Sequence, residues 1–114
     1  MHIDNYRFGQ IDIEGLSYDM DIIVFPEHVQ ARWWRQEGHR LALEDLATVL
    51  AEPPEVLVVG TGYYGRMQVP EETLDGLRRA GIDVRLADTG AAVEVFNRLQ
   101  QTCARSVAAL HLTC

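Results

Sequence analysis

Hydrophobic and polar residues follow two different patterns along the chain, and the change between them divides the sequence into two halves. In the first half, residues 10–16 alternate polar and apolar side chains, which is typical of a strand with one buried face. Residues 20–25 are more continuously apolar and β-branched, which predicts a strand covered on both faces and ended by Pro26. We expect these two segments to form an antiparallel platform, and a further short strand over residues 28–34.

The second half alternates between helix and strand. The second half begins with a helix that ends at Pro53-Pro54. The apolar face of this helix has i, i+3, i+4, i+7 spacing and consists of Leu43, Leu46, Ala47 and Leu50. Strands are predicted over residues 55–60, 82–87 and 107–112. Between them, one helix begins near Pro70 and ends before Gly81, and another is capped by Asp88 or Thr89. The last helix buries Ala92, Val95, Phe96 and Leu99.

This order of elements predicts a single compact α/β domain over residues 1–114, with a strand-rich first half and a βαβαβ second half. Connection rules for βαβ units imply parallel pairing in the second half. A chain of 114 residues with 47% apolar residues has enough material for one core, and neither half is large enough to fold alone.

Charge and cysteine content narrow the classes of partner. The formal net charge of -7, with no basic cluster, argues against nucleic acid as a partner. No run of 18 apolar residues is present, so we expect no membrane insertion, and the first residues do not have the pattern of a secretion signal. Two cysteines, Cys103 and Cys114, cannot build a disulfide framework or a four-cysteine zinc site, which favours the cytoplasm.

The sharpest motif is a glycine-rich loop, Gly60-Thr61-Gly62-Tyr63-Tyr64-Gly65, which follows a predicted buried strand. Its spacing matches the dinucleotide fingerprint, and Asp88 lies where a ribose-binding acid would stand. The helix begins too late for that role, because four residues separate Gly65 from Pro70. Two interpretations stay open: a backbone site for a smaller anion, assisted by Arg66, or a tight turn whose tyrosines cover a neighbouring surface.

Aromatic and histidine residues gather in the segment Arg32 to His39. Adjacent aromatic residues on a strand point to opposite faces, so one tryptophan can anchor the core while the other, Trp34, contacts a partner. Alternatively, both tryptophans pack at a sheet edge, stacked by Arg32 or Arg35. His39 is either a general base or a hydrogen-bonded turn residue.

The end of the sequence, His111-Leu112-Thr113-Cys114, places a histidine near a thiol. On an extended strand, residues three apart face opposite sides, so His111 and Cys114 converge only if the chain turns after Leu112. We therefore expect no metal site and no bound cofactor. Cys103 is interpreted as a small buried hydrophobe.

Several of these segments, taken in order, resemble a small conserved domain family of unknown function. They are Arg32-Trp33-Trp34-Arg35, Gly38-His39, Asp45-Leu46, Glu55 to Gly62, Val69-Pro70, Gly81-Ile82, Thr89, Ala92-Val93, Asn97 and His111 to Cys114. Relatives in that family include an adipogenesis-associated domain protein and a mitochondrial assembly factor for respiratory complex I. The resemblance implies a three-layer α/β fold with a central mixed sheet whose last strand runs antiparallel to the others. It also implies that no enzymatic activity is established for the family and that some members bind other proteins.

Two functional hypotheses follow. The first is a non-enzymatic protein-interaction or assembly-factor-like domain, with Trp34, Tyr63 and Tyr64 as contact residues for an unidentified protein, or for a second copy of the chain. The second is a small-molecule or anion site beneath the glycine-rich loop, in either a binding protein or an enzyme. Its candidate residues are Gly60, Thr61, Gly62, Gly65, Arg66, His39 and His111.

Overall fold

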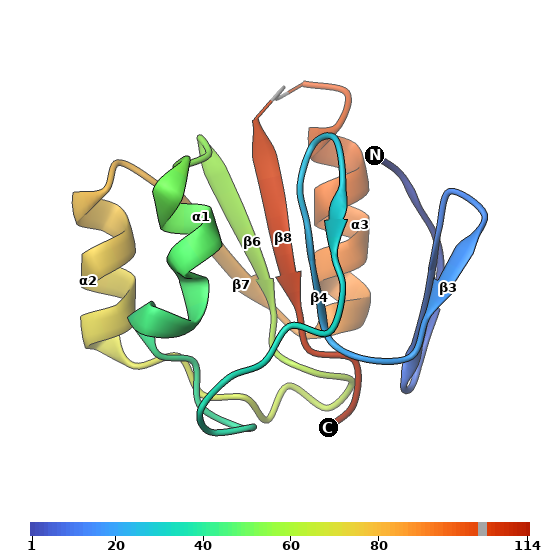
Figure 1. Cartoon of the computed structure of the whole chain (residues 1–114), viewed down its shortest axis with the longest axis horizontal. Coiled ribbons are helices and arrows are strands. Elements are labelled where there is room, and N and C mark those ends of the chain that lie inside the picture. Colours follow the sequence, from blue (N-terminus) through green and yellow to red (C-terminus); the bar gives the residue numbers. More distant parts are fainter. Residues whose placement is uncertain (103–104) are drawn as a thin grey trace.

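A mixed sheet of five strands forms the central layer of the protein (Figure 1). The computed structural model describes residues 1–102 and 105–114, so the interpretation of Cys103 lies outside the described residues. The strands are Ile22–Val24 (β4), Val29–Gln30 (β5), Val56–Gly60 (β6), Asp83–Ala87 (β7) and Ser106–Leu110 (β8). They stand side by side in the order β5-β4-β8-β6-β7.

A second, smaller sheet precedes the central one in sequence. Its strands, Ile3–Arg7 (β1), Gln10–Ile13 (β2) and Leu16–Tyr18 (β3), pair antiparallel in chain order. Asn97 attaches this sheet to the rest of the molecule, because its side chain accepts a hydrogen bond from the Ile3 N–H and donates one to the Ile3 carbonyl, both at 2.9 Å.

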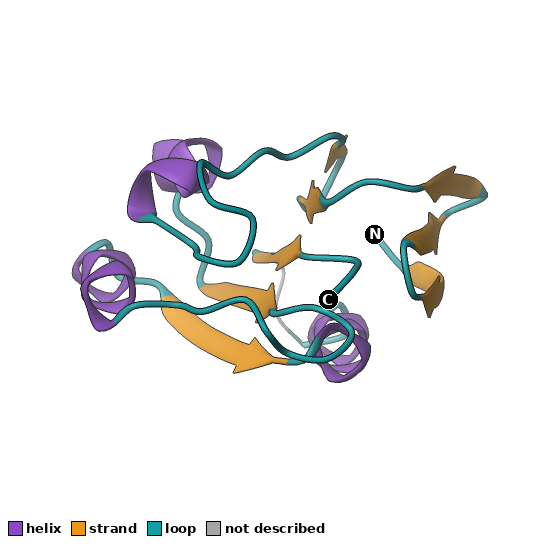
Figure 2. Cartoon of the chain, turned by 90° about the horizontal axis from the view of Figure 1, so that it is seen from below, coloured by secondary structure: helices purple, strands orange, loops and turns teal. Residues whose placement is uncertain are grey.

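Helices cover both faces of the central sheet (Figure 2). A 3-10 turn, Leu43–Leu46 (η1), leads into Ala47–Ala51 (α1), and the later helices are Glu71–Arg79 (α2) and Thr89–Leu99 (α3). One face lies against α1 and α2, and the other lies against α3 and the small sheet. The predicted three-layer α/β fold with a central mixed sheet is confirmed.

Two apolar clusters are buried on the two faces. Residues of β6 and β8 alternate between them: Leu57 and Val107 belong to the cluster on the α1 and α2 side, while Val58 and Ala108 belong to the cluster with Phe96. Because alternate residues of a strand point to opposite faces, a strand covered on both sides needs a continuous apolar run. This explains why β6 and β8 are buried along their whole length.

The parallel pairs of the sheet are β6 with β7 and β6 with β8. The connection from β6 to β7 through α2 and the connection from β7 to β8 through α3 run in opposite directions along the sheet. Right-handed connections of this kind place α2 and α3 on opposite faces, as observed. The expectation that the last strand runs antiparallel to the others is wrong, since β8 is antiparallel to β4 alone. Its central position lets it join the parallel strands to the antiparallel ones.

The predicted antiparallel platform is also wrong. The segment 10–16 does not stay one strand, because Glu14 and Gly15 adopt left-handed backbone angles, with φ of 48° and 86°, and turn the chain back. As a result β2 pairs with β1 and β3, while β4 pairs with β5 and β8 in the other sheet.

The strand expected over residues 28–34 is limited to β5. Arg32, with φ of 54°, leaves the extended conformation and ends any pairing before the tryptophans. The prediction that one tryptophan is buried and the other exposed is nevertheless confirmed, since Trp33 is 5% exposed and Trp34 is 74% exposed. The alternative, in which both pack at the sheet edge, is wrong for Trp34.

The helix boundaries of the second half agree well with the sequence pattern. Pro70 precedes α2 and Gly81 follows it with φ of 82°, while the Asp88 side chain caps α3 by accepting from the Ala91 N–H at 3.0 Å. The earlier helix differs, because its first turn is the 3-10 segment η1, which has three residues per turn. Its buried residues are therefore Leu46 and Val49, and Ala47 is exposed.

None of the helices described is long and apolar enough to cross a membrane, and the longest, α3, has 11 residues.

Candidate functional site

The carboxyl ends of β6, β7 and β8 meet at one end of the central sheet, onto which Figure 2 looks. Open α/β sheets commonly bind ligands outside the carboxyl ends of their parallel strands. Because β4 runs antiparallel to β8, its first residue reaches the same end. The glycine-rich loop, the Arg32 to His39 segment and the last four residues are therefore brought together here.

Asp21, immediately before β4, is the centre of a buried polar cluster. Its Oδ2 accepts a hydrogen bond from Arg35 Nη2 at 2.7 Å and lies 2.7 Å from His111 Nδ1. Its Oδ1 accepts from the Leu112 N–H at 2.8 Å, and its main-chain carbonyl accepts from the Trp33 N–H at 2.8 Å. One residue thus connects β4, the tryptophan segment and the end of the chain.

The environment of Asp21 fixes its charge. Burial works to raise the pKa of the carboxyl, but hydrogen bonds from His111, the Leu112 N–H and Arg35 outweigh it and hold the pKa below its ordinary value. Since the carboxylate accepts hydrogen bonds, we assign a proton to His111 Nδ1, which donates to Asp21 Oδ2.

Two atoms of this cluster retain hydrogen-bonding capacity. Arg35 Nη1 and His111 Nε2 are buried and have no partner among the described residues. The side chains are 4% and 6% exposed, and the Arg35 guanidinium stacks on the Trp33 ring at 4.8 Å. Buried donors and acceptors without partners are uncommon, so these two atoms mark a candidate polar site.

The glycine-rich loop uses its main-chain N–H groups within the protein. The N–H groups of Thr61, Gly62, Tyr63 and Gly65 donate to Ala87 O, Thr89 Oγ1, Thr113 O and Gly62 O, at 2.9, 2.9, 2.7 and 3.1 Å. Since these donors are engaged, they do not form an open cradle for an anion. These four N–H groups are therefore not available to a ligand at this loop.

Glycine is required in the loop because three backbone segments approach one another closely. A Cβ at Gly62 would lie 2.8 Å from the carbonyl oxygens of Thr113 and Cys114 and 2.9 Å from His111 Cδ2, and the residue has φ of 110°. A Cβ at Gly60 would lie 2.8 Å from both Leu110 and Thr89. Together these glycines let the loop pack on the end of the chain and on the start of α3.

Three exposed rings form what we call the aromatic patch: Phe8, Tyr63 and Tyr64. The Tyr63 ring lies 5.7 Å from Phe8 and 5.1 Å from Tyr64, in edge-to-face arrangements. Tyr6 lies against Tyr63 at 6.2 Å and donates to Leu112 O at 2.8 Å. Burial raises the pKa of Tyr6 to about 12, so the phenol stays protonated and can donate.

A small polar hollow lies beside the cluster, with a volume of about 280 Å³. Its walls are Glu37, His39, Arg40, Arg66 and Gln68. His39 also packs edge-to-face on His111 at 5.8 Å, and its Nε2 lies 3.9 Å from Cys114 Sγ. Within residues 1–102 and 105–114, no three His, Cys, Asp or Glu side chains are grouped so as to hold a metal ion.

The structure brings most of the sequence-predicted site residues to one place. Gly62 and His39 both contact His111, and Arg66 shares the polar hollow with His39. None of the ring contacts between described residues involves Trp34, which stands apart from the aromatic patch.

Sequence reasoning missed Asp21 and Phe8, and treated Arg35 as a stacking residue. A charged residue inside the apolar run 20–25 was the signal that could have identified Asp21. Phe8 had no such signal, because its role depends on the turn between β1 and β2.

Comparisons with known proteins place the chain among uncharacterised relatives. A family model described as "Protein of unknown function (DUF498/DUF598)" matches residues 3–111. The conserved hypothetical protein PH1505 from Pyrococcus horikoshii OT3 is 28% identical with a TM-score of 0.80, and the match covers 100% of both chains.

Two further solved structures are similar over nearly the whole chain. A Bartonella henselae protein, described as an outer membrane protein, is 31% identical with a TM-score of 0.82, covering 98% of this chain and 94% of that one. A Bordetella pertussis protein, described as a Mth938-like domain, is 27% identical with a TM-score of 0.79, covering 97% of this chain and 85% of that one.

Replacement of Gly62 by alanine should destabilise the protein by about 2–4 kcal/mol, because the new Cβ meets rigid carbonyl oxygens at a left-handed position. Gly15→Ala is the matched control, since Gly15 has φ of 86° but no atom within 4 Å of the added Cβ. Urea unfolding measures both. An equal loss of unfolding free energy in the two variants would show that the close approach of the carbonyl oxygens does not contribute to the destabilisation.

Asp21→Asn should lower the free energy of unfolding by about 2–4 kcal/mol near neutral pH, because it leaves the buried Arg35 guanidinium without its carboxylate. The folded-state pKa of Asp21 is depressed, so its stabilisation is complete above the ordinary value of 3.8 and is lost as pH falls through the lower folded value. The difference in free energy of unfolding between the unmodified protein and the Asp21→Asn variant should therefore become smaller as the pH is lowered.

Urea unfolding from about pH 7 to about pH 3 checks this linkage. Asp75→Asn, at an exposed position on α2, is the control and should change stability little at any pH. A stability difference for Asp21→Asn that stays constant across the range contradicts the assignment of an ionised, hydrogen-bonded carboxylate.

Proposed function

Since the chain belongs to the DUF498/DUF598 family of proteins of unknown function, we propose that it acts as a non-enzymatic protein-interaction domain. The observation that carries the proposal is the aromatic patch of Phe8, Tyr63 and Tyr64, which gathers exposed rings from two distant parts of the sequence. Tyrosine is enriched at the energetic centres of protein interfaces, and clustered exposed apolar side chains commonly mark binding surfaces.

Rigidity of the patch supports the same proposal. The Tyr63 N–H is held by Thr113 O, and the Gly62 N–H and carbonyl are held by the Thr89 side chain and main chain. A surface whose rings are already ordered loses little conformational entropy on binding, so more of its contact energy appears as affinity. Arg66 extends the patch, with its guanidinium 5.6 Å from the Tyr64 ring centre.

Shielding of the imidazole–carboxylate pair favours a non-enzymatic role. The unpartnered His111 Nε2 is buried, so a substrate cannot reach it in this arrangement. The other histidine at this end, His39, is exposed and contacts a thiol rather than a carboxylate. General base catalysis needs the base within hydrogen-bond reach of the substrate proton.

In this proposal residues 1–114 work as one domain in the cytoplasm and bind another protein, or a second copy, through the patch. Trp34, 74% exposed and separate from the patch, is a second contact point. The role is similar to that of an assembly factor: the domain holds a partner and performs no reaction on it.

Introducing a photo-crosslinking phenylalanine at Tyr64 in the intact protein should give one discrete adduct in cells, identified by mass spectrometry. In the complex with that partner, Tyr63→Ser combined with Tyr64→Ser should weaken affinity at least about tenfold, because interface tyrosines commonly contribute more than about 1 kcal/mol each. Calorimetry with the purified partner measures the loss.

Leu16→Ser is the matched control, since Leu16 and Tyr64 are both 63% exposed but Leu16 lies in β3. The affinity of the Leu16→Ser variant for the partner should be the same as that of the unmodified protein. Equal weakening by the control, or the same adducts from crosslinkers at positions 16 and 64, would contradict a specific patch. An adduct of twice the chain mass would identify the partner as a second copy.

A second candidate function is binding of a small anion in the polar hollow, favoured by the convergence of His39 and Arg66 there. Arg40 already forms ion pairs with Glu37 at 3.9 Å and with Glu72 at 3.1 Å, so Arg66 is the better contact for an anion. This candidate relies on side chains, since the N–H groups of Thr61, Gly62, Tyr63 and Gly65 are engaged within the protein.

Inorganic phosphate should then shift the amide NMR signals of Arg66 and Gln68, and Arg66→Gln should abolish the shift. Arg79→Gln, at the exposed end of α2, serves as the control and should leave the shift unchanged. Shifts that survive in Arg66→Gln would reject the hollow as an anion site.

A further inference from the structure

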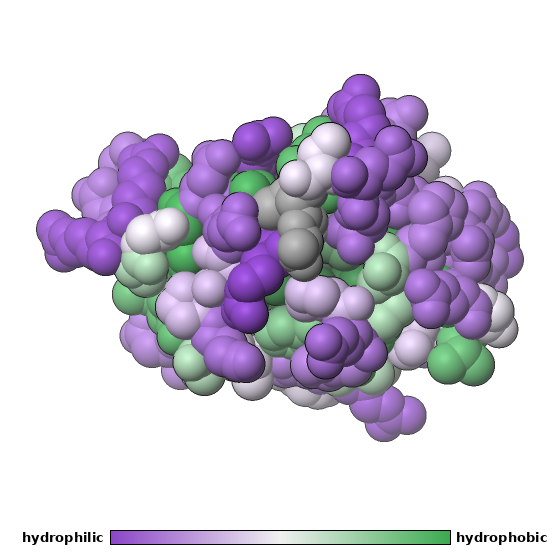
Figure 3. All heavy atoms as spheres, turned by 90° about the horizontal axis from the view of Figure 1, so that it is seen from above, coloured by the Kyte–Doolittle hydropathy of each residue, from purple (hydrophilic) through white to green (hydrophobic). Residues whose placement is uncertain are grey.

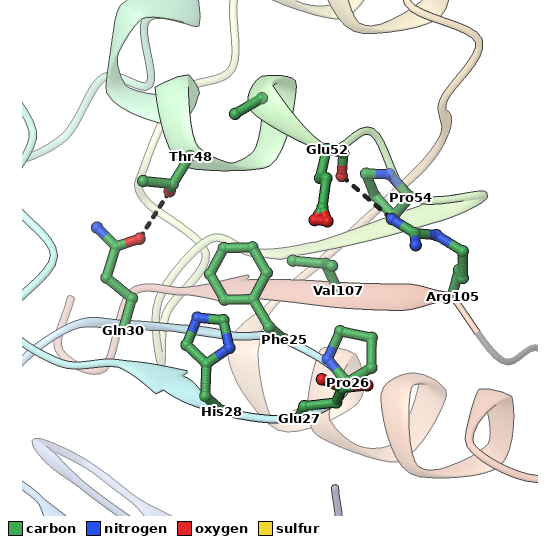
Figure 4. Close-up of a pocket in the computed structure, with 11 residues that line it drawn as sticks. Phe25, Pro26, Glu27, His28, Gln30, Thr48, Glu52, Pro54, Arg105 and Val107 are labelled. Carbon is green, nitrogen blue, oxygen red and sulfur yellow. Dashed lines mark hydrogen bonds between the residues drawn. The ribbon is translucent and has the colours of Figure 1, made fainter.

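A larger cavity lies at the opposite end of the central sheet, between the turn joining β4 to β5 and the end of α1 (Figure 4). Its volume is about 710 Å³, which falls within the range of about 300–1,000 Å³ typical of small-molecule sites. It shares no lining residue with the polar hollow or the aromatic patch. Any role it has is therefore separate from the proposed protein contact.

Interactions at both ends keep the cavity walls in place. At one end the Thr48 hydroxyl of α1 donates to the Gln30 side-chain carbonyl of β5 at 2.6 Å. At the other end Arg105 Nη2 donates to the Glu52 main-chain carbonyl at 3.4 Å, and Figure 4 shows both links. Pro26 and Pro54 form parts of the wall with restricted backbones. The cavity is thus preformed.

A flat apolar surface occupies the middle of the cavity. The rings of Phe25 and His28 are stacked, with centres 4.6 Å apart and planes 7° apart, and the Phe25 N–H donates to the His28 carbonyl at 2.8 Å. Val107 of β8 is buried behind them. Stacked rings over an aliphatic floor suit a planar apolar group, which gains from offset stacking and area burial.

The charges around the cavity are unequal. Glu27 and Glu52 contribute two carboxylates and Arg105 contributes one guanidinium. Figure 4 shows the Glu52 side chain pointing from the end of α1 toward Phe25 and Val107, while the opposite end holds the neutral Gln30 and Thr48 pair. A ligand with a cationic end is therefore favoured in one orientation.

The surrounding surface agrees with a small ligand rather than a protein. Figure 3 looks onto this end and shows hydrophilic side chains over most of it, with apolar residues visible mainly in recesses between them. Among the described residues, no broad apolar rim suited to a protein partner is seen on this face. The net charge of -7 adds a long-range attraction for cations.

We propose that this cavity is a binding site for an organic amine, a ligand with a planar apolar ring and an ammonium group. The ring packs against Phe25 and Val107, and the ammonium group lies between the Glu27 and Glu52 carboxylates. The Gln30 and Thr48 end accepts a neutral polar substituent.

Three probes of matched shape test the proposal: 2-phenylethylamine, 2-phenylethanol and 3-phenylpropionate carry the same ring with a positive, neutral or negative end. Amide NMR titration of the full chain should show millimolar binding of the amine, with shifts confined to residues 25–30, 48–52 and 105–107. The amine should bind at least about fivefold more tightly than the carboxylate.

Paired variants separate charge from shape. Glu27→Gln with Glu52→Gln should weaken amine binding about three- to tenfold and leave the alcohol unchanged, because the removed contributions are ion pairs. Glu94→Gln, at an exposed position on α3, is the control. Ala51→Phe adds a ring at the cavity wall and should reduce binding of all the probes, with thermal unfolding confirming that the variant folds.

Several results would overturn the proposal. One is binding of phenylpropionate as tightly as the amine, and another is absence of shifts with every probe at its solubility limit. Shifts centred on the aromatic patch instead of residues 25–30 would also reject it. N-acetyl-lysine methylamide supplies an ammonium group without a ring, and binding as tight as that of phenylethylamine would show that the ring is not recognised.

Discussion

The partly buried carboxylate of Asp21 makes the interactions on which the arrangement of the candidate site depends. It accepts hydrogen bonds from Arg35, His111 and the Leu112 N–H, and so connects the start of β4 to the tryptophan segment and to the end of the chain. A buried guanidinium is tolerated only when a carboxylate faces it, and here the partner is also fixed by two further donors. The three segments are consequently ordered together.

The exposed chemistry of the site is built on that buried cluster. Once the end of the chain is held, Thr113 O fixes the Tyr63 N–H, and Leu112 O accepts from both Tyr6 and the Gly9 N–H. These bonds set the positions of the rings in the aromatic patch. The glycines of the loop matter here for the space that they leave, which lets three backbone segments meet. A motif that resembles a phosphate loop in sequence is therefore used for packing.

The sequence predicts the second half of the fold well because its signals are local. Pro70, Gly81 and Asp88 act within one turn of their helices, and continuous apolar runs identify β6 and β8. Pairing between distant strands is not a local property, which is why β2 was assigned to the wrong sheet. The parallel pairing expected from the βαβαβ order is present between β6 and β8, and the wrong direction for β8 was an implication of the family resemblance. The left-handed conformation of Arg32 likewise depends on tertiary contacts, because residue preference alone disfavours it. Of the site, His39, His111 and the glycine-rich loop were predicted, while Asp21 and Phe8 acquire their roles only when distant segments meet.

Amide hydrogen exchange on the Asp21→Asn variant tests the central claim most directly, because it reports each hydrogen bond of the site separately. The account predicts that exchange accelerates more at the Leu112, Tyr63 and Gly9 N–H groups than in α2, where only the global loss of stability acts. Uniform acceleration across the protein, or unchanged protection at Tyr63 and Gly9, would contradict the claim that Asp21 orders this end of the molecule.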